Sequence, residues 1–386
     1  MRSIRLALLS FSIALLALPP QGLCSQSLTP SVQTGEIGQA KYLIARPRGP
    51  WNGRLLIHAH GYRNPDEPLI ANLSTERLAY ATLLNEGWML ATTSYRRNGM
   101  ILTDAVGDID ALREHIATHF GEPTCVILEG ESMGGTIVTL IAERGSGSYQ
   151  GAVAIDAALQ AREDNGTGGV SLQPRIPMIF LANQSEWEGP RNYVMRASNE
   201  ARINHEIVAP ALFRISRSGH VNVNQAERLV ALHALVAWIE KGRDALPRPQ
   251  PQSIDGLSVH GSDVFFDATV VPPVQPSRVT FDSNGEGFAA TVTEVSLGHG
   301  NLFIEVQPSD FEKIGVKPRG YFKLKAGEKT YRVRYGRDFS SVPVGQWVMF
   351  PNADGYFWLA RNHQNAARTS GLSKGQSVHI SRYPKE

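Results

Sequence analysis

Residues 125–135 read Cys-Val-Ile-Leu-Glu-Gly-Glu-Ser-Met-Gly-Gly, and this stretch decides the fold. The apolar run from Cys125 to Leu128 has the length and composition of a buried strand. Gly130 to Gly134 then fits Gly-x-Ser-x-Gly, and a helical pattern of small residues opens at Gly135. A serine on a sharp strand-to-helix turn between glycines is typical of a nucleophile elbow. The stretch therefore predicts that Ser132 is a nucleophile.

Short apolar runs alternate with helical patterns on both sides of this turn. Strands are predicted at 54–58, 87–93, 124–129, 151–155, 177–182 and 211–216, and helices at 75–84, 104–119, 135–142 and 225–241. Strands that alternate with helices form a mostly parallel sheet covered on both faces. The sequence thus predicts an α/β domain over residues 31–244.

The composition changes after this domain. Residues 246–252 space three prolines in an extended segment, which predicts a linker over 245–256. Beyond it, runs of strand character at 288–295, 302–306, 321–325, 331–335 and 346–350 are separated by Gly and Pro. Residues 257–386 are therefore predicted to form a small β-rich, barrel-like domain.

The N-terminus has the order of a secretory signal. Arg2 and Arg5 precede an apolar run from Leu6 to Leu18, and Pro19 and Pro20 end it. Such a run is short for a bilayer span, so residues 1–24 are predicted to be a cleaved signal, with an uncleaved anchor as the alternative. The mature protein is expected to be secreted or periplasmic and to have no later membrane span.

The charge balance excludes some partners. Without the two arginines of the signal, the chain has 36 basic and 36 acidic residues. No excess positive charge is available to capture nucleic acid, so no nucleic-acid partner is expected. With Cys24 at the expected cleavage site, Cys125 has no disulfide partner and is interpreted as a small core residue.

A serine hydroxyl needs a base within hydrogen-bond reach. Among eleven histidines, His220 is favoured, because Ser218-Gly219-His220 follows the last predicted strand of the α/β domain and precedes its last helix. It also comes after the serine, in the chain order serine, acid, histidine.

The acid that would orient His220 is less determined. Glu186 is preferred, because it lies in the loop after the buried strand 177–182. Glu188 in the same loop and Asp156 at the end of the previous strand are the alternatives.

An oxyanion formed at Ser132 would need backbone donors. His60-Gly61 directly follows the strand 54–58, so the amides of Tyr62 and Met133 are the candidate donors. His58 and His60 could instead form a metal pair, but no further ligand pattern follows them, so no metal is expected.

These features together resemble the α/β-hydrolase family over roughly residues 35–241. The resemblance rests on His60-Gly61, the Gly130–Gly135 elbow, the strand before Glu186, and Ser218-Gly219-His220. It implies an eight-stranded type of sheet, no cofactor and hydrolysis through an acyl-enzyme. The acid departs from the family's commoner Asp. The short segment between 156 and 177 leaves little material for a lid, so an open site for a bulky or extended ester is expected.

Residues 291–380 resemble the C-terminal β-domain of the S-adenosylmethionine hydroxide adenosyltransferase and fluorinase family. The matching stretches are Gly300-Asn301-Leu302, 331–335, 339–345, Asn365-Ala366-Ala367 and 371–375. The family's Asn-Ser-x-Gly turn here reads Asn352-Ala353-Asp354-Gly355, so the ligand-contacting serine is missing, as is the family's larger N-terminal domain. The resemblance favours a role in packing, substrate docking or homo-oligomer assembly over adenosyl chemistry.

The sequence thus predicts a secreted serine hydrolase that cleaves small or extended carboxylic esters at Ser132. Two alternatives remain open: a peptidase or amidase that uses the same site, and a binding protein whose C-terminal domain captures a nucleoside-like ligand.

Overall fold

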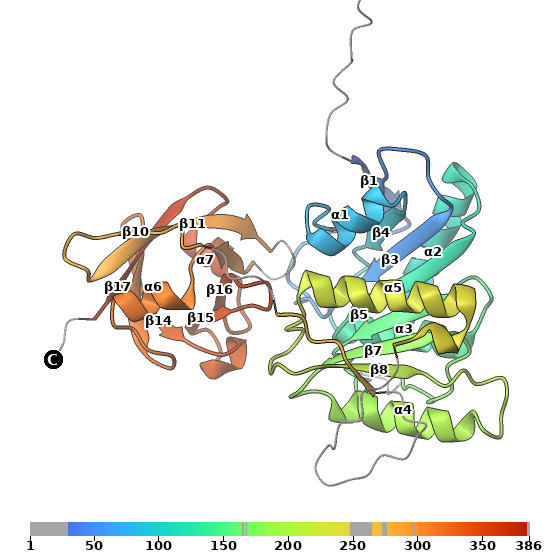
Figure 1. Cartoon of the computed structure of the whole chain (residues 1–386). Helices are drawn as coiled ribbons and strands as arrows, with labels where there is room; N and C mark the ends of the chain where they lie inside the picture. The colour runs from blue at the N-terminus through green and yellow to red at the C-terminus, as the bar shows by residue number, and fades with distance from the viewer. Residues whose placement is uncertain are drawn as a thin grey trace, which may run out of the picture.

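The computed structural model describes residues 30–163, 166, 168–247, 265–271, 276–296, 298 and 300–383. They form two units, an α/β unit and a β-barrel (Figure 1). The predicted signal, residues 1–24, and residues 248–256 of the predicted linker lie outside the described residues. No helix of the described part is both long and apolar enough to cross a bilayer.

The first sheet confirms the predicted α/β-hydrolase fold. In the described residues it has nine strands in the order β1-β2-β4-β3-β5-β6-β7-β8-β9, antiparallel at β1 and β2 and parallel from β4 to β9. The strands are β1 (Ser31–Ile37), β2 (Ala40–Arg46), β3 (Arg54–Ala59), β4 (Met89–Thr93), β5 (Cys125–Glu131), β6 (Gly151–Ile155), β7 (Met178–Asn183), β8 (Ala211–Ile215) and β9 (Phe265–Asp267). The hairpin of β1 and β2 was not predicted, because β1 is a largely exposed edge strand without an apolar run.

Helices cover both faces of this sheet, as the predicted alternation requires. They are α1 (Leu78–Asn85), α2 (Thr103–Phe120), α3 (Met133–Arg144), α4 (Glu188–Glu200) and α5 (Gln225–Lys241). Leu55 and Ile57 of β3 belong to a core cluster that includes residues of α2, α3 and α4, whereas Leu56 belongs to a second cluster that includes residues of α1 and α5. Strands buried on both faces must be apolar at successive positions, which is why these strands were recognisable in the sequence.

The C-terminal unit confirms the predicted small β-domain. Its elements are β10 (Thr280–Phe281), β11 (Gly287–Val295), β12 (Leu302–Ile304), α6 (Pro308–Lys313), β13 (Tyr321–Ala326), β14 (Lys329–Tyr335), β15 (Trp347–Pro351), β16 (Phe357–Arg361), α7 (Ala366–Ser370) and β17 (Ser377–Arg382). Because β11 pairs with both β12 and β17, seven of the described strands close into a barrel. Phe311 of α6 fills the barrel and contacts the rings of Phe288, Phe322 and Phe357.

The chain returns to the first sheet after the proline-spaced segment. β9, at Phe265–Asp267, pairs in parallel with β8. This differs from the predicted division at residue 257, which assigned these residues to the C-terminal domain. Leu246, in the predicted linker, is buried in the first unit's core. A three-residue strand is too short for its pairing partner to be recognised from sequence pattern alone.

Candidate active site

Ser132 lies on a strained turn between β5 and α3. Its φ is 57° and its ψ is −119°, a conformation that few non-glycine residues adopt. The turn leaves no room beside it: a Cβ on Gly130 would lie 2.2 Å from the carbonyl oxygen of Gly134. A Cβ on Gly134 would lie 2.0 Å from the carbonyl oxygen of Ala59. Both glycines of the motif are therefore required by backbone contacts across the turn.

This requirement predicts a large effect of Gly134→Ala. The added methyl group meets main-chain atoms of β3, which cannot rotate away, so we expect a loss of about 3 kcal/mol in the free energy of unfolding. Gly49→Ala is the matched control, because a Cβ there meets nothing within 4 Å. Urea unfolding measures both variants, and equal stability of the two would contradict the packing seen at the turn.

Three of the predicted site residues form one hydrogen-bonded chain. His220 Nε2 lies 2.8 Å from Ser132 Oγ, and His220 Nδ1 lies 2.7 Å from Glu186 Oε2. The three residues follow β5, β7 and β8, because the carboxyl ends of parallel strands meet at one edge of the sheet. The side chains of His220 and Glu186 remain about one-third exposed, at 31% and 34%. The hydrogen-bonded residues are therefore within reach of a small molecule.

The charges around His220 favour its protonated form. Burial by itself would lower the pKa of His220, but the hydrogen bond and the charge of Glu186 outweigh it. Asp156 and Glu131 add to the same effect, and the pKa of His220 is raised above its ordinary value. A histidine held in this way can accept the proton of a serine hydroxyl.

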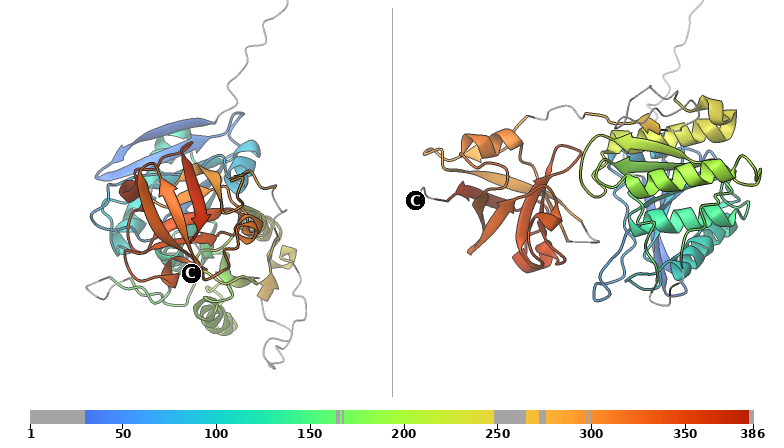
Figure 2. Two further views of the ribbon diagram at one scale, coloured as in Figure 1. Left: turned by 90° about the vertical axis from the view of Figure 1, so that its left-hand side faces the viewer. Right: turned by 90° about the horizontal axis from the view of Figure 1, so that it is seen from below.

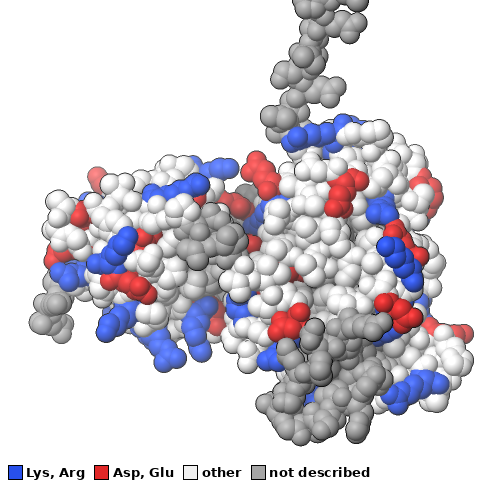
Figure 3. Space-filling view, in the orientation of Figure 1, with Lys and Arg blue, Asp and Glu red and all other residues white. Residues whose placement is uncertain are grey.

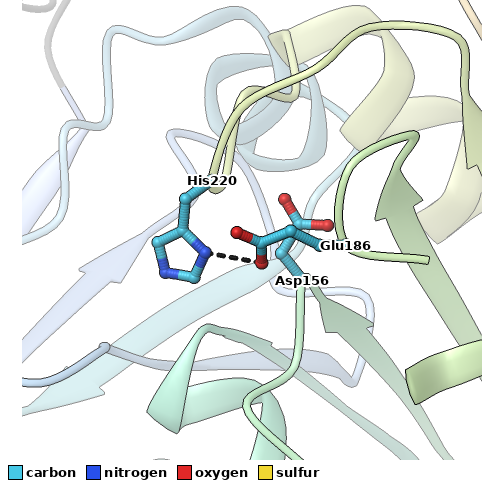
Figure 4. A group of neighbouring side chains, drawn as sticks. All are labelled: Asp156, Glu186 and His220. Carbon is cyan, nitrogen blue, oxygen red and sulfur yellow. Dashed lines mark hydrogen bonds and ion pairs between the residues drawn. The ribbon is translucent and has the colours of Figure 1, made fainter. Parts of the chain in front are cut away.

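The structure separates the three candidate acids. Glu186 contacts the His220 ring directly, and Asp156 lies beside Glu186 (Figure 4). Both oxygens of Asp156 accept backbone N–H groups at 2.7 Å, one from Asn183 and one from Val221. Burial raises the pKa of Asp156 to about 7. Glu188 begins α4 instead. Asp156 thus holds together the two segments that carry Glu186 and His220.

Glu186→Gln is expected to shift the pH dependence of the site. Without the carboxylate, burial dominates and the pKa of His220 falls, so the acid limb of kcat/KM moves to lower pH. We expect kcat to fall by about 10²- to 10⁴-fold. Asp156→Asn is the comparison variant, and an acid limb that shifts there but not in Glu186→Gln would assign the acid to Asp156. Ester hydrolysis measured across pH distinguishes these results.

The candidate oxyanion donors flank Ser132. A Cβ on Gly61 would lie 3.9 Å from Ser132 Oγ, so the segment leading to Tyr62 passes beside the serine. Met133 is the first residue of α3, where backbone N–H groups lack intrahelical partners. The ring of His60 contacts the carbonyl oxygens of Gly61 and Ser94 at 2.6 and 3.2 Å and is buried. His60 thereby holds this segment in place; donation by Tyr62 and Met133 stays a prediction.

A buried charge cluster under the serine was missed at the sequence level. Arg228 of α5 donates to Glu129 at 2.7 Å and to Glu131 at 2.9 Å. Glu129, fully buried in β5, also accepts from Tyr80 and lies 3.0 Å from Nδ1 of His58. Burial would raise the pKa of both carboxyl groups, but Arg228 holds each at about 2. The sequence signal for this cluster was a glutamate within an apolar strand, because a buried carboxylate requires a buried partner.

The two histidines of the candidate metal pair have separate hydrogen-bond partners. His58 contacts Glu129, whereas His60 contacts two carbonyl oxygens. Asp156, Glu186 and His220 offer ligand atoms within 4.8 Å of one another. Hydrogen bonds already use both Asp156 oxygens and both His220 nitrogens. A hydrogen-bonded relay accounts for these three residues better than a cation site does.

The barrel brings together stretches that are distant in sequence. A Cβ on Gly300 would lie 2.0 Å from Asn365 Oδ1, and the Ala367 amide donates to the Gly300 carbonyl oxygen at 2.8 Å. Residues 298–379 match the family model of the SAM hydroxide adenosyltransferase C-terminal domain. This match confirms the resemblance predicted for the C-terminal β-domain, and it covers less than half of the chain.

Comparison with solved structures gives more distant similarities. An uncharacterized conserved protein from Thermotoga maritima is 19% identical, with a TM-score of 0.26, over 28% of this chain and 40% of its own. A putative dipeptidyl aminopeptidase IV from Bacteroides ovatus is 15% identical, with a TM-score of 0.43, over 55% of this chain and 36% of its own. Est1E from Butyrivibrio proteoclasticus is 14% identical, with a TM-score of 0.37, over 53% of this chain and 99% of its own. A search of curated sequences finds no match.

Proposed function

We propose that this protein is a serine hydrolase that cleaves carboxylic esters. The observation that carries the proposal is the hydrogen-bonded chain from Ser132 Oγ through His220 to Glu186. This arrangement activates a hydroxyl that is otherwise a weak nucleophile. The strained turn at Ser132 and its place before α3 support the same interpretation.

In the proposed reaction, His220 Nε2 takes the proton of Ser132 as Oγ attacks the ester carbonyl carbon. The resulting oxyanion receives hydrogen bonds from the Tyr62 and Met133 amides. The tetrahedral intermediate collapses, His220 returns the proton to the leaving alkoxide, and an acyl-enzyme on Ser132 remains. Water, activated by the same histidine, then releases the carboxylic acid. Glu186 orients the ring and stabilises its protonated form throughout.

Labelling with a fluorophosphonate tests the nucleophile and its activation together. We expect one modified peptide, which contains Ser132, and no labelling of Ser132→Ala. His220→Asn should slow labelling strongly while the protein stays folded. Modification of another serine, or equal labelling of Ser132→Ala, would overturn the proposal.

A substrate panel tests the leaving group. Aryl and alkyl esters are compared with aminoacyl amides at matched acyl groups, and we expect higher kcat/KM for the esters. Higher values for the amides would assign the same site to a peptidase or amidase.

We also propose that the protein is exported through residues 1–24. Fractionation of cells that express the full chain tests this proposal.

A further inference from the structure

The barrel is attached to the segment that follows β3. Glu294 of β11 accepts hydrogen bonds from Ser74 Oγ at 3.1 Å and from Arg77 at 2.9 Å. The Arg77 guanidinium also lies 5.3 Å from the ring centre of Phe303. In addition, Arg368 of α7 forms an ion pair with Glu67. All of the partners in the first unit belong to residues 67–77, on the side of the site that carries Tyr62.

A second attachment lies on the side that carries His220. Asp354 Oδ1 accepts the backbone N–H of Gln225 at 2.9 Å. Gln225 is the first residue of α5 and follows His220 by five positions in the chain. Asp354 lies in the turn Asn352–Gly355, where the C-terminal domain family has its ligand-contacting serine. In this chain the turn therefore contacts the first unit.

A third contact brings the barrel close to Ser132. Arg63 is buried and donates to Asn72 Oδ1 at 2.6 Å, which fixes the segment after β3. Gly298 of the barrel packs against it, since a Cβ there would lie 3.0 Å from Arg63 Nε. Arg63 is two residues from Gly61, which lies beside Ser132.

These contacts place the barrel against the edge of the sheet where the site lies. The parallel strands end at this edge, α5 begins there, and Figures 1 and 2 show the barrel beside it. One attachment involves the segment that follows Tyr62, and the other involves the helix that follows His220. The site is nevertheless open, because Tyr62 is 42% exposed and His220 is 31% exposed.

We propose that the docked barrel is a fixed wall of the substrate site and limits the bulk of the ester that reaches Ser132. The inference rests on the proposed function. It accounts for the short segment between β6 and β7, because the C-terminal domain takes the place of a lid. Narrow, unbranched acyl chains enter between the two units, and broad ones are excluded, which reverses the preference for a bulky ester expected from the short segment between 156 and 177.

The test removes both attachments in the full chain, with the triple variant Glu294→Ala/Asp354→Ala/Arg368→Ala, which lacks the three barrel side chains that bond to residues 67–77 and to Gln225. The substrates are p-nitrophenyl butyrate and p-nitrophenyl cyclohexylbutyrate, which share the reacting group and differ in remote bulk. We expect kcat/KM for the bulky ester, relative to the small one, to rise at least about 10-fold. Glu286→Ala is the matched control, because it breaks an ion pair with Arg382 within the barrel. An unchanged ratio in the triple variant would overturn the inference.

Two further measurements keep this test decisive. The variant Glu67→Ala/Ser74→Ala/Arg77→Ala/Asp354→Ala removes the same hydrogen bonds and ion pair if the first variant folds poorly. Labelling rates of Ser132 with a small and a bulky fluorophosphonate should show the same change in ratio. If the wild-type protein neither turns over esters nor labels at Ser132, the proposed function fails. If it does both and neither ratio changes, only the inference about the barrel fails.

Discussion

Replacing Ser132 with alanine is expected to lower kcat for simple aryl esters by about 10⁴- to 10⁶-fold. The variant loses the atom that forms the acyl-enzyme, and among the residues that the structure describes no other hydroxyl is hydrogen-bonded to His220. The remaining site would still bind substrate through its backbone donors. KM should therefore change much less than kcat.

Folding should be unaffected by this substitution, because Ser132 Oγ makes its hydrogen bond to a side chain that is partly exposed. Circular dichroism and thermal unfolding serve as the control. The measurement is the rate of p-nitrophenol release at saturating substrate. A variant that retains more than about a hundredth of the wild-type kcat would be incompatible with covalent catalysis at Ser132.

The second large effect is expected at Arg228, where methionine should destabilise the first unit by about 3–5 kcal/mol. Its guanidinium is nearly fully buried and pairs with the fully buried carboxylate of Glu129. Removing one partner leaves the other charge buried without compensation, which costs more than the loss of an exposed pair. The free energy of unfolding in urea measures the effect.

Two companion variants isolate the cause. Arg382→Met breaks an exposed ion pair with Glu286 and should cost no more than about 1 kcal/mol. The double variant Glu129→Gln/Arg228→Met should recover part of the lost stability, because Glu129 no longer carries a charge. If adding Glu129→Gln to Arg228→Met lowers the free energy of unfolding as much as Glu129→Gln does alone, the two residues do not act as a pair.

Charged side chains lie both on the surface of the molecule and in its interior. Basic and acidic side chains are interspersed over the face shown in Figure 3. Inside the first unit, the buried side chains of Glu129 and Arg228 form an ion pair, and the partly exposed Glu131 pairs with the same guanidinium. Arg228 is almost a hundred residues away from both glutamates in the chain. No pattern over a short window can pair such residues, although a charge in an apolar strand indicated that a partner exists.

The sequence by itself determined the parallel sheet, the turn that carries Ser132 and the order of serine and histidine along the chain. These features depend on local patterns: apolar runs of strand length, helical periodicity and two glycines that a tight turn requires. Tertiary structure decided which acid contacts His220, since Asp156, Glu186 and Glu188 all follow neighbouring strand ends. It also decided the pairing of Arg228 with Glu129 and the attachment of the barrel beside the site. Those outcomes depend on distances between segments far apart in the chain, and only packing within and between the two units sets these distances.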